Sequence, residues 1–158
     1  ACSRAGCLGE RARCNIGHYP RTDPAVSVSV GDGERLLLGR EASWPARRWS
    51  VLAGFVEPGE NLEQSVMREV FEESQVRVRA CRYLGSQPWP FPSSLMLGFE
   101  ADAEPDDPVP NPDELEDVRW FTREEIGAAL RGETEEEGVL LSAPVSISRW
   151  LIERWYRA

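Results

Sequence analysis

The segment Gly54–Val76 constrains the fold more than any other part of this 158-residue chain. A Pro-Gly pair within it favours a turn, and Asn61 followed three residues later by Gln64 is typical of a helix N-cap with its capping-box partner. We therefore predict a helix over Leu62–Ser74. The apolar side chains of this helix recur on one stripe, which has to pack against the rest of the domain.

Three glutamates share one face of the predicted helix. Each helical residue advances by about 100°, so Glu69, Glu72 and Glu73 fall within roughly one third of the circumference. A solvated acidic face is the simplest explanation, but Glu73 lies at the edge of the apolar stripe, where a glutamate is unusual. Repulsion between the carboxylates disfavours the helix unless a cation lies over them, and Mg²⁺ or Mn²⁺ prefers such oxygen ligands. Arg68 is placed to orient Glu72, or to form a simple surface pair with it.

Length and charge narrow the classes of function. The chain has room for one domain with a proper core. Its net charge of −9 argues against broad electrostatic capture of nucleic acid. All 18 basic residues are arginine, which excludes a lysine-dependent phosphate loop or Schiff base. Because the chain has neither a bilayer-length apolar run nor a segment that resembles a signal peptide, we expect a cytoplasmic protein without membrane contacts.

Periodicity predicts further strands and helices on both sides of this helix. Alternation over Ala25–Val30, a glycine-rich turn and the run Arg35–Arg40 indicate a hairpin. Residues 86–93 hold three prolines, which make a poor central strand, so we expect a loop there. An acidic, proline-rich surface loop is expected over 102–113. The remaining expected elements are strands over 76–85, 94–101 and 117–121 and helices from 122 and over 146–156.

The spacing of Gly54, Glu60 and the run Arg68–Val76 resembles the Nudix box. This resemblance implies the α/β Nudix fold, an α/β/α sandwich with a mixed β-sheet and a loop-helix-loop catalytic motif. It implies Mg²⁺ or Mn²⁺ as cofactor and a catalytic group of Arg68, Glu69, Glu72 and Glu73. The implied metal ligands are the Ala53 carbonyl, Glu69, Glu72, Glu73 and Glu114.

Gln75 is the one departure from the box, which normally has glycine at this position. A glycine just past a helix end usually supplies a left-handed residue. A glutamine there costs about 1 kcal/mol or shifts the turn. We therefore expect an irregular exit from the helix and intact carboxylate ligands.

A second motif, SQPWPFPSSLM over Ser86–Met96, resembles the signature of the NADH pyrophosphatase branch, also named NAD-capped RNA hydrolases. The segments HYPRTDPAV and LAGF, over His18–Val26 and Leu52–Phe55, resemble the same branch. Three prolines restrict the backbone of the motif, so that its rings can stack on a base and its amide can read one. The dinucleotide contacts implied by the resemblance are Tyr19, Phe55, Gln87, Pro88, Trp89, Pro90, Phe91, Pro92, Ser93, Ser94 and Ser148.

The first residues carry an incomplete set of cysteines. The family has a four-cysteine zinc ribbon before the catalytic domain, whereas this chain has Cys2, Cys7 and Cys14. Tetrahedral Zn²⁺ needs four ligands, so these three would have to recruit His18 or Cys81. We interpret residues 1–20 as a degenerate remnant of a zinc ribbon and residues 21–158 as the Nudix hydrolase domain.

The two motifs together imply hydrolysis of NADH or NAD to nicotinamide mononucleotide and AMP, with Glu73 or Glu114 as general base. Removal of an NAD cap from RNA 5′ ends is an alternative, because the dinucleotide pocket would be the same. A catalytically weak Nudix-fold module that binds a nucleotide is a third. The resemblance also suggests a homodimer.

Overall fold

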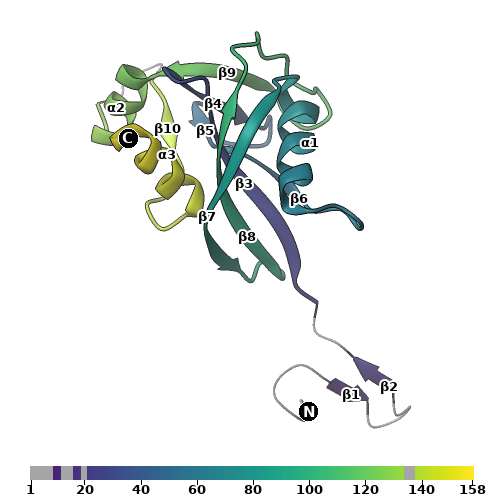
Figure 1. The fold of residues 1–158 in the computed structure, drawn as a ribbon. Helices are drawn as coiled ribbons and strands as arrows, with labels where there is room; N and C mark the ends of the chain where they lie inside the picture. The colour runs from purple at the N-terminus through teal and green to yellow at the C-terminus, as the bar shows by residue number, and fades with distance from the viewer. Residues whose placement is uncertain (1–8, 12–15, 19–20, 134–137) are drawn as a thin grey trace.

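The computed structural model describes residues 9–11, 16–18, 21–133 and 138–158, and a six-stranded mixed sheet forms its centre (Figure 1). The strand order is β7-β8-β3-β4-β9, and β6 pairs with β3. β3 runs parallel to β8 and antiparallel to β4 and β6. The strands of this sheet are β3 (Asp23–Gly31), β4 (Arg35–Arg40), β6 (Leu52–Phe55), β7 (Val78–Trp89), β8 (Ser94–Ala103) and β9 (Asp117–Thr122).

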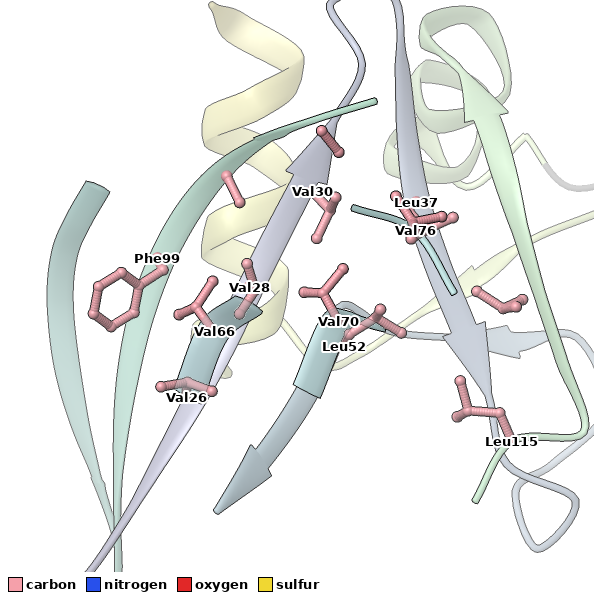
Figure 2. Close-up of a cluster of buried hydrophobic side chains, with 13 residues drawn as sticks. Val26, Val28, Val30, Leu37, Leu52, Val66, Val70, Val76, Phe99 and Leu115 are labelled. Atoms are coloured by element: carbon pink, nitrogen blue, oxygen red, sulfur yellow. The ribbon is translucent and has the colours of Figure 1, made fainter. Parts of the chain in front are cut away.

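Helix α1 (Leu62–Ser74) covers one face of the sheet, and α2 (Arg123–Arg131) and α3 (Ile147–Arg157) lie on the other side (Figure 1). Side chains alternate along β3, so successive residues point to opposite faces of the sheet. Its valines, including Val26 and Val28, pack with Val66 and Val70 of α1 in one buried cluster (Figure 2). This arrangement confirms the predicted α/β/α sandwich.

The face towards α3 carries small residues that let the helix lie close to the strands. A Cβ atom on Gly31 would be 3.1 Å from Nε1 of Trp155, and one on Gly98 would be 2.9 Å from Cδ1 of Ile147. A second buried cluster fills the space between the sheet and the two C-terminal helices. It includes Leu36, Leu38, Phe121, Ile126, Leu151, Ile152 and Trp155.

Helix α1 begins and ends where the sequence predicts. The Asn61 side chain accepts a hydrogen bond from the Gln64 N–H at 2.8 Å, and Gln64 Oε1 accepts one from the Asn61 N–H at 3.0 Å. At the other end, Gln75 adopts the left-handed conformation, with φ at 59°. Its N–H donates to the Phe71 carbonyl at 2.8 Å. The exit is therefore regular, and the expectation of an irregular exit was wrong: the turn is not shifted, and Gln75 bears the conformational cost of the left-handed conformation.

Strand β7 is longer than the sequence predicts. The expectation of a loop over 86–93 was wrong for its first half, because β7 continues to Trp89, which pairs with Ser94. β7 is the edge strand of the sheet. Pro88, which has no N–H, can lie on an edge strand because the outer side of that strand needs no ladder partner. The predicted connection is reduced to residues 90–93.

Two small strand pairs lie outside this sheet. β1 (Gly9–Arg11) and β2 (Ile16–His18) are antiparallel, and β5 (Arg48–Trp49) and β10 (Leu140–Leu141) are parallel. Tyr19 and the three N-terminal cysteines are outside the described residues, so the predicted zinc-ribbon remnant stays a prediction. Within the described part of the chain, no helix is both long and apolar enough to cross a membrane.

Candidate active site

An open cleft of about 520 Å³ lies along the carboxylate face of α1. Its other walls come from β6, from the start of the loop after β4 and from the end of the loop before β9. All five predicted metal ligands contribute to it, together with Arg68 and Phe55. The full lining is Glu41, Ala53, Gly54, Phe55, Glu57, Arg68, Glu69, Glu72, Glu73, Asp113, Glu114 and Leu115.

Glu73 is the most perturbed carboxylate in the cleft. Glu73 is only 7% exposed, and its Oε2 atom is buried without a hydrogen-bond partner among the residues that the structure describes. Burial raises the pKa of Glu73 to about 8, and the charges of Glu69, Glu114 and Glu41 act in the same direction. A backbone hydrogen bond from Ala53 opposes them. The Glu73 carboxylate is thus poised to accept a positive partner.

Glu69 lies beside Glu73, and its carboxylate fits there only because residue 54 is a glycine. A Cβ atom on Gly54 would overlap the Glu69 carboxylate. The pKa of Glu69 is also raised, because the effect of burial exceeds the opposing effect of the neighbouring Arg68. The glycine that opens the Nudix box therefore has a steric role, because any side chain there displaces a cleft carboxylate.

Arg68 joins the loop before α1 to the carboxylates on α1. Its guanidinium forms a two-point ion pair with Glu60, at 2.6 and 2.8 Å. The same group contacts Glu69 at 2.9 Å and Glu72 at 3.0 Å, and it donates to the Phe55 carbonyl at 2.9 Å. The ion pair with Arg68 lowers the pKa of Glu60 to about 2. Arg68 is therefore an orienting group and more than the simple surface pair that the sequence allowed.

Glu114 reaches the cleft because the acidic loop is attached to the end of α1. The N–H of Val109 donates to the Ser74 carbonyl at 2.9 Å, and the N–H of Asn111 donates to the Glu73 carbonyl at 3.1 Å. These bonds satisfy carbonyls that a helix C-terminus leaves free. The Glu114 N–H then donates to the Asn111 carbonyl at 3.0 Å, so the turn carrying Glu114 is held next to Glu73.

These oxygen donors fit a divalent cation. Carboxylates and a backbone carbonyl are the ligands that Mg²⁺ and Mn²⁺ prefer, and the Glu73 Oε2 atom has no other partner among the described residues. Within the described ranges, no group of three or more acidic, histidine or cysteine side chains is already arranged to hold a metal ion. Glu69 and Glu72 instead contact Arg68.

Phe55, a predicted stacking residue, lines this cleft and lies in one row with Gln87 on a face of the sheet. Phe55 pairs with Ala25, Ala25 with Met96 and Met96 with Gln87, so these side chains form one row across four strands. At a spacing of about 4.8 Å per strand, the row spans roughly 14 Å from Phe55 to Gln87. Phe55 is 59% exposed and belongs both to this row and to the acidic cleft.

The β7–β8 turn carries the other aromatic residues of the proline-rich motif. Trp89 lies two residues beyond Gln87 on the same face of β7, because side chains alternate along a strand. Its ring contacts that of Phe91 edge-on, with centroids 5.5 Å apart, and Phe91 is 73% exposed. The other predicted contacts in this turn and its flanks are Pro88, Pro90, Pro92, Ser93 and Ser94.

Two predicted dinucleotide contacts have other partners. Both polar ends of the Gln87 amide bond to the backbone at the start of α3. Ser148 is buried and its hydroxyl lies 2.8 Å from that of Ser50. The sequence interpretation missed Glu41, Ser50 and the role of Glu60. Glu60 alone carried a signal, since it belongs to the box.

The chain resembles known proteins over most of its length. The NUDIX domain family matches residues 20–142. A Mycobacterium bovis protein named NAD-capped RNA hydrolase NudC is 50% identical over 143 residues, which cover 87% of this chain and 46% of that protein. A protein of the same name from Stutzerimonas stutzeri is 45% identical over 149 residues, covering 92% and 50%. The chain thus spans about half the length of the curated relatives it matches.

Solved structures show the same architecture. A crystal structure of a NUDIX hydrolase from Nitrosomonas europaea has a TM-score of 0.63 at 28% identity, covering 78% of this chain and 77% of that one. A MutT NUDIX hydrolase from Burkholderia pseudomallei has a TM-score of 0.62 at 20% identity, covering 85% and 98%, and shows the fold alone. The matched residues 20–142 contain α1, β6 and the acidic cleft, and the chain belongs to the NUDIX domain family.

Proposed function

We propose that this chain is a metal-dependent pyrophosphatase that hydrolyses NADH or NAD. One water is consumed, one P–O bond of the pyrophosphate breaks, and nicotinamide mononucleotide and AMP are released. The observation that carries the proposal is the acidic cleft, in which buried Glu73 lies close to Glu69 and Glu114 and has one oxygen with no hydrogen-bond partner in the described part of the chain. The proline-rich motif and the relatives named NAD-capped RNA hydrolase support a dinucleotide substrate.

The cation would be held by the Ala53 carbonyl, Glu69, Glu73 and Glu114, with Glu72 next to them. Bound Mg²⁺ or Mn²⁺ supplies charge that neutralises the pyrophosphate and lowers the pKa of a water ligand. The residues of this chain position the reactants. Arg68 orients Glu69 and Glu72, and it also holds the Phe55 carbonyl at the edge of the cleft.

Phe55, Trp89 and Phe91 would stack on the bases of the dinucleotide. All three rings are exposed, so each can contact a flat ligand. Glu73 or Glu114 would take the proton of the attacking water. Their surroundings differ, since Glu73 is buried whereas Glu114 is exposed.

Glu73→Gln should lower metal-stimulated NADH hydrolysis by about 10²-fold or more and leave dinucleotide binding largely intact, because a neutral amide is a much weaker cation ligand than a carboxylate and is no base. Glu63→Gln is the matched control, since Glu63 is exposed on the same helix and outside the cleft. A pH–rate profile of Glu114→Gln assigns the base. If Glu73→Gln and Glu63→Gln have equal activity, the proposal fails.

Removal of the NAD cap from RNA is the second candidate, and the names of the relatives favour it. The two reactions break the same bond, so the acidic cleft fits both. Turnover of free NADH and of NAD-capped RNA, measured side by side, separates them. A wide preference for capped RNA would replace our first choice.

A catalytically weak nucleotide-binding module is the third candidate. It is disfavoured because a module without chemistry has no need for mutually repelling carboxylates around Glu73. Absence of metal-stimulated hydrolysis for every nucleoside diphosphate derivative tested would support it.

Our proposal includes a cytoplasmic location, a homodimer and a degenerate zinc-ribbon remnant over residues 1–20, all of which stay predictions.

A further inference from the structure

The first turn of α3 is attached to the proline-rich motif through one side chain. Gln87 of β7 donates from Nε2 to the Val145 carbonyl at 2.7 Å. Its Oε1 accepts from the Ile147 N–H at 2.8 Å. Both ends of the amide therefore have a protein partner, on two backbone groups that flank the N-cap residue Ser146. Such a two-point bond holds the turn in both position and orientation.

The same turn is attached to the β6 side of the sheet through Ser148. Its Oγ lies 2.8 Å from the Ser50 Oγ and 3.4 Å from the N–H of Val51, which directly precedes β6. Ser148 is only 9% exposed, so a ligand reaches it poorly. Gln87 links the start of α3 to β7, and Ser148 links it to the two residues just before β6.

Between these attachments the turn rests directly on the sheet. Gly98 of β8 lies under Ile147, and a Cβ atom there would be only 2.9 Å from the Ile147 Cδ1 atom. Gly98 pairs with Ser27, and Ser27 pairs with Ala53 of β6. The next row of the sheet is the one that carries Phe55 and Gln87. The turn therefore lies on the same face of the sheet as Phe55 and Gln87, next to the row that would hold the dinucleotide.

We propose that the first turn of α3 is a strut that sets the separation of Phe55 on β6 and Trp89 on β7. Gln87, Ser148 and Ser50 are positioning residues, which act on the dinucleotide through the two aromatic rings. This inference rests on the proposed function and deepens it. It assigns a role to Ser50, for which the sequence carries no motif.

Ser50 provides the sharpest test, because a direct contact between Ser148 and substrate would not need it. Ser50→Ala should raise the KM for NADH by about fivefold, the effect of one lost hydrogen bond. Ser148→Ala and Gln87→Ala each lose a second hydrogen bond and should raise the KM at least as much. The kcat should stay within about twofold, because the carboxylates lie on α1, on the other face of the sheet. Ser50→Thr keeps the hydroxyl and should restore the KM.

Two further variants complete the design. Ser50→Ala combined with Ser148→Ala should be no worse than Ser148→Ala alone, because Ser148→Ala already removes the hydrogen bond that the two hydroxyls share. Arg157→Ala, in the last turn of α3, should leave the kinetics unchanged, because Arg157 is exposed and far along the helix from the strut.

The strut is refuted if Ser148→Ala raises the KM and Ser50→Ala does not. It is also refuted if Gln87→Ala changes the preference between NADH and its hypoxanthine analogue, since that result means that Gln87 reads the base. Amide hydrogen exchange at the start of α3 tests it without activity. Exchange should be faster in the Ser50→Ala and Gln87→Ala variants, and unchanged exchange overturns the inference. A wild-type chain that hydrolyses no dinucleotide contradicts only the proposed function.

Discussion

Replacing Glu73 by glutamine should stabilise the metal-free protein at neutral and alkaline pH. The pKa of Glu73 is raised from 4.5 to about 8, and burial of the carboxylate is the largest cause. A carboxyl group with a higher pKa in the folded state binds its proton more tightly when folded. The folded state therefore loses stability as the pH rises from 4.5 to about 8. Glutamine has no proton to lose, so this loss should disappear.

The expected difference in stability follows from the interval between the two pKa values. Each pH unit between the two pKa values costs about 1.4 kcal/mol, which gives on the order of 4 kcal/mol at the upper end. The amide of the variant also lacks a partner for one polar atom, at a cost of about 1 kcal/mol. The variant should thus be about 3 kcal/mol more stable than the wild type near pH 8, and no more stable near pH 4.

Urea unfolding at several pH values, with a chelator present, measures this difference directly. Glu63→Gln serves as control because it removes an exposed carboxylate from the same helix. Added Mg²⁺ should stabilise the wild type and have a much smaller effect on Glu73→Gln. Equal stabilities of the wild type and Glu73→Gln across the pH range would show that the carboxylate is not desolvated, and would refute the reasoning.

Three further predictions concern single side chains. Gly54→Ala should fold but lose about 100-fold in hydrolysis, because its Cβ atom displaces the Glu69 carboxylate. Circular dichroism tests the folding and a kinetic assay tests the activity, and near-normal turnover would contradict the prediction. Gln75→Gly should raise the free energy of unfolding by about 0.5–1 kcal/mol, since φ is 59° there; an unchanged urea midpoint would count against this strain. Phe55→Ala should raise the KM about tenfold through lost stacking and leave kcat unchanged, as steady-state kinetics would show; an unaltered KM would exclude Phe55 from binding.

Local features of the chain could be predicted from the sequence. Helix α1 begins and ends as expected because its capping box, apolar stripe and helix exit all lie within the segment that forms it. The position of Glu69, Glu72 and Glu73 on one helix face could be predicted from the helical repeat alone. At Gln75 the sequence left two outcomes open, a conformational cost or a shifted turn, and the irregular exit expected there does not occur.

Features that depend on tertiary neighbours could not be predicted in the same way. The continuation of β7 to Trp89 follows from its place at the edge of the sheet, which its own residues do not reveal. Glu114 lies in the cleft because backbone bonds join its loop to Ser74 and Glu73, and the side-chain pattern contains no sign of them. The partners of Gln87 and Ser148 are 58 to 98 residues away along the chain, so their hydrogen bonds needed the folded structure.

Product analysis of NADH incubated with this chain and Mg²⁺ or Mn²⁺ tests the central claim most directly. Chromatography and mass spectrometry in ¹⁸O-labelled water should show reduced nicotinamide mononucleotide and AMP in equal amounts, with one labelled oxygen in one of the two products. The reaction should stop when a chelator is added and should be nearly absent in Glu73→Gln. Unchanged NADH in the presence of either cation, or cleavage that a chelator does not prevent, would contradict the account.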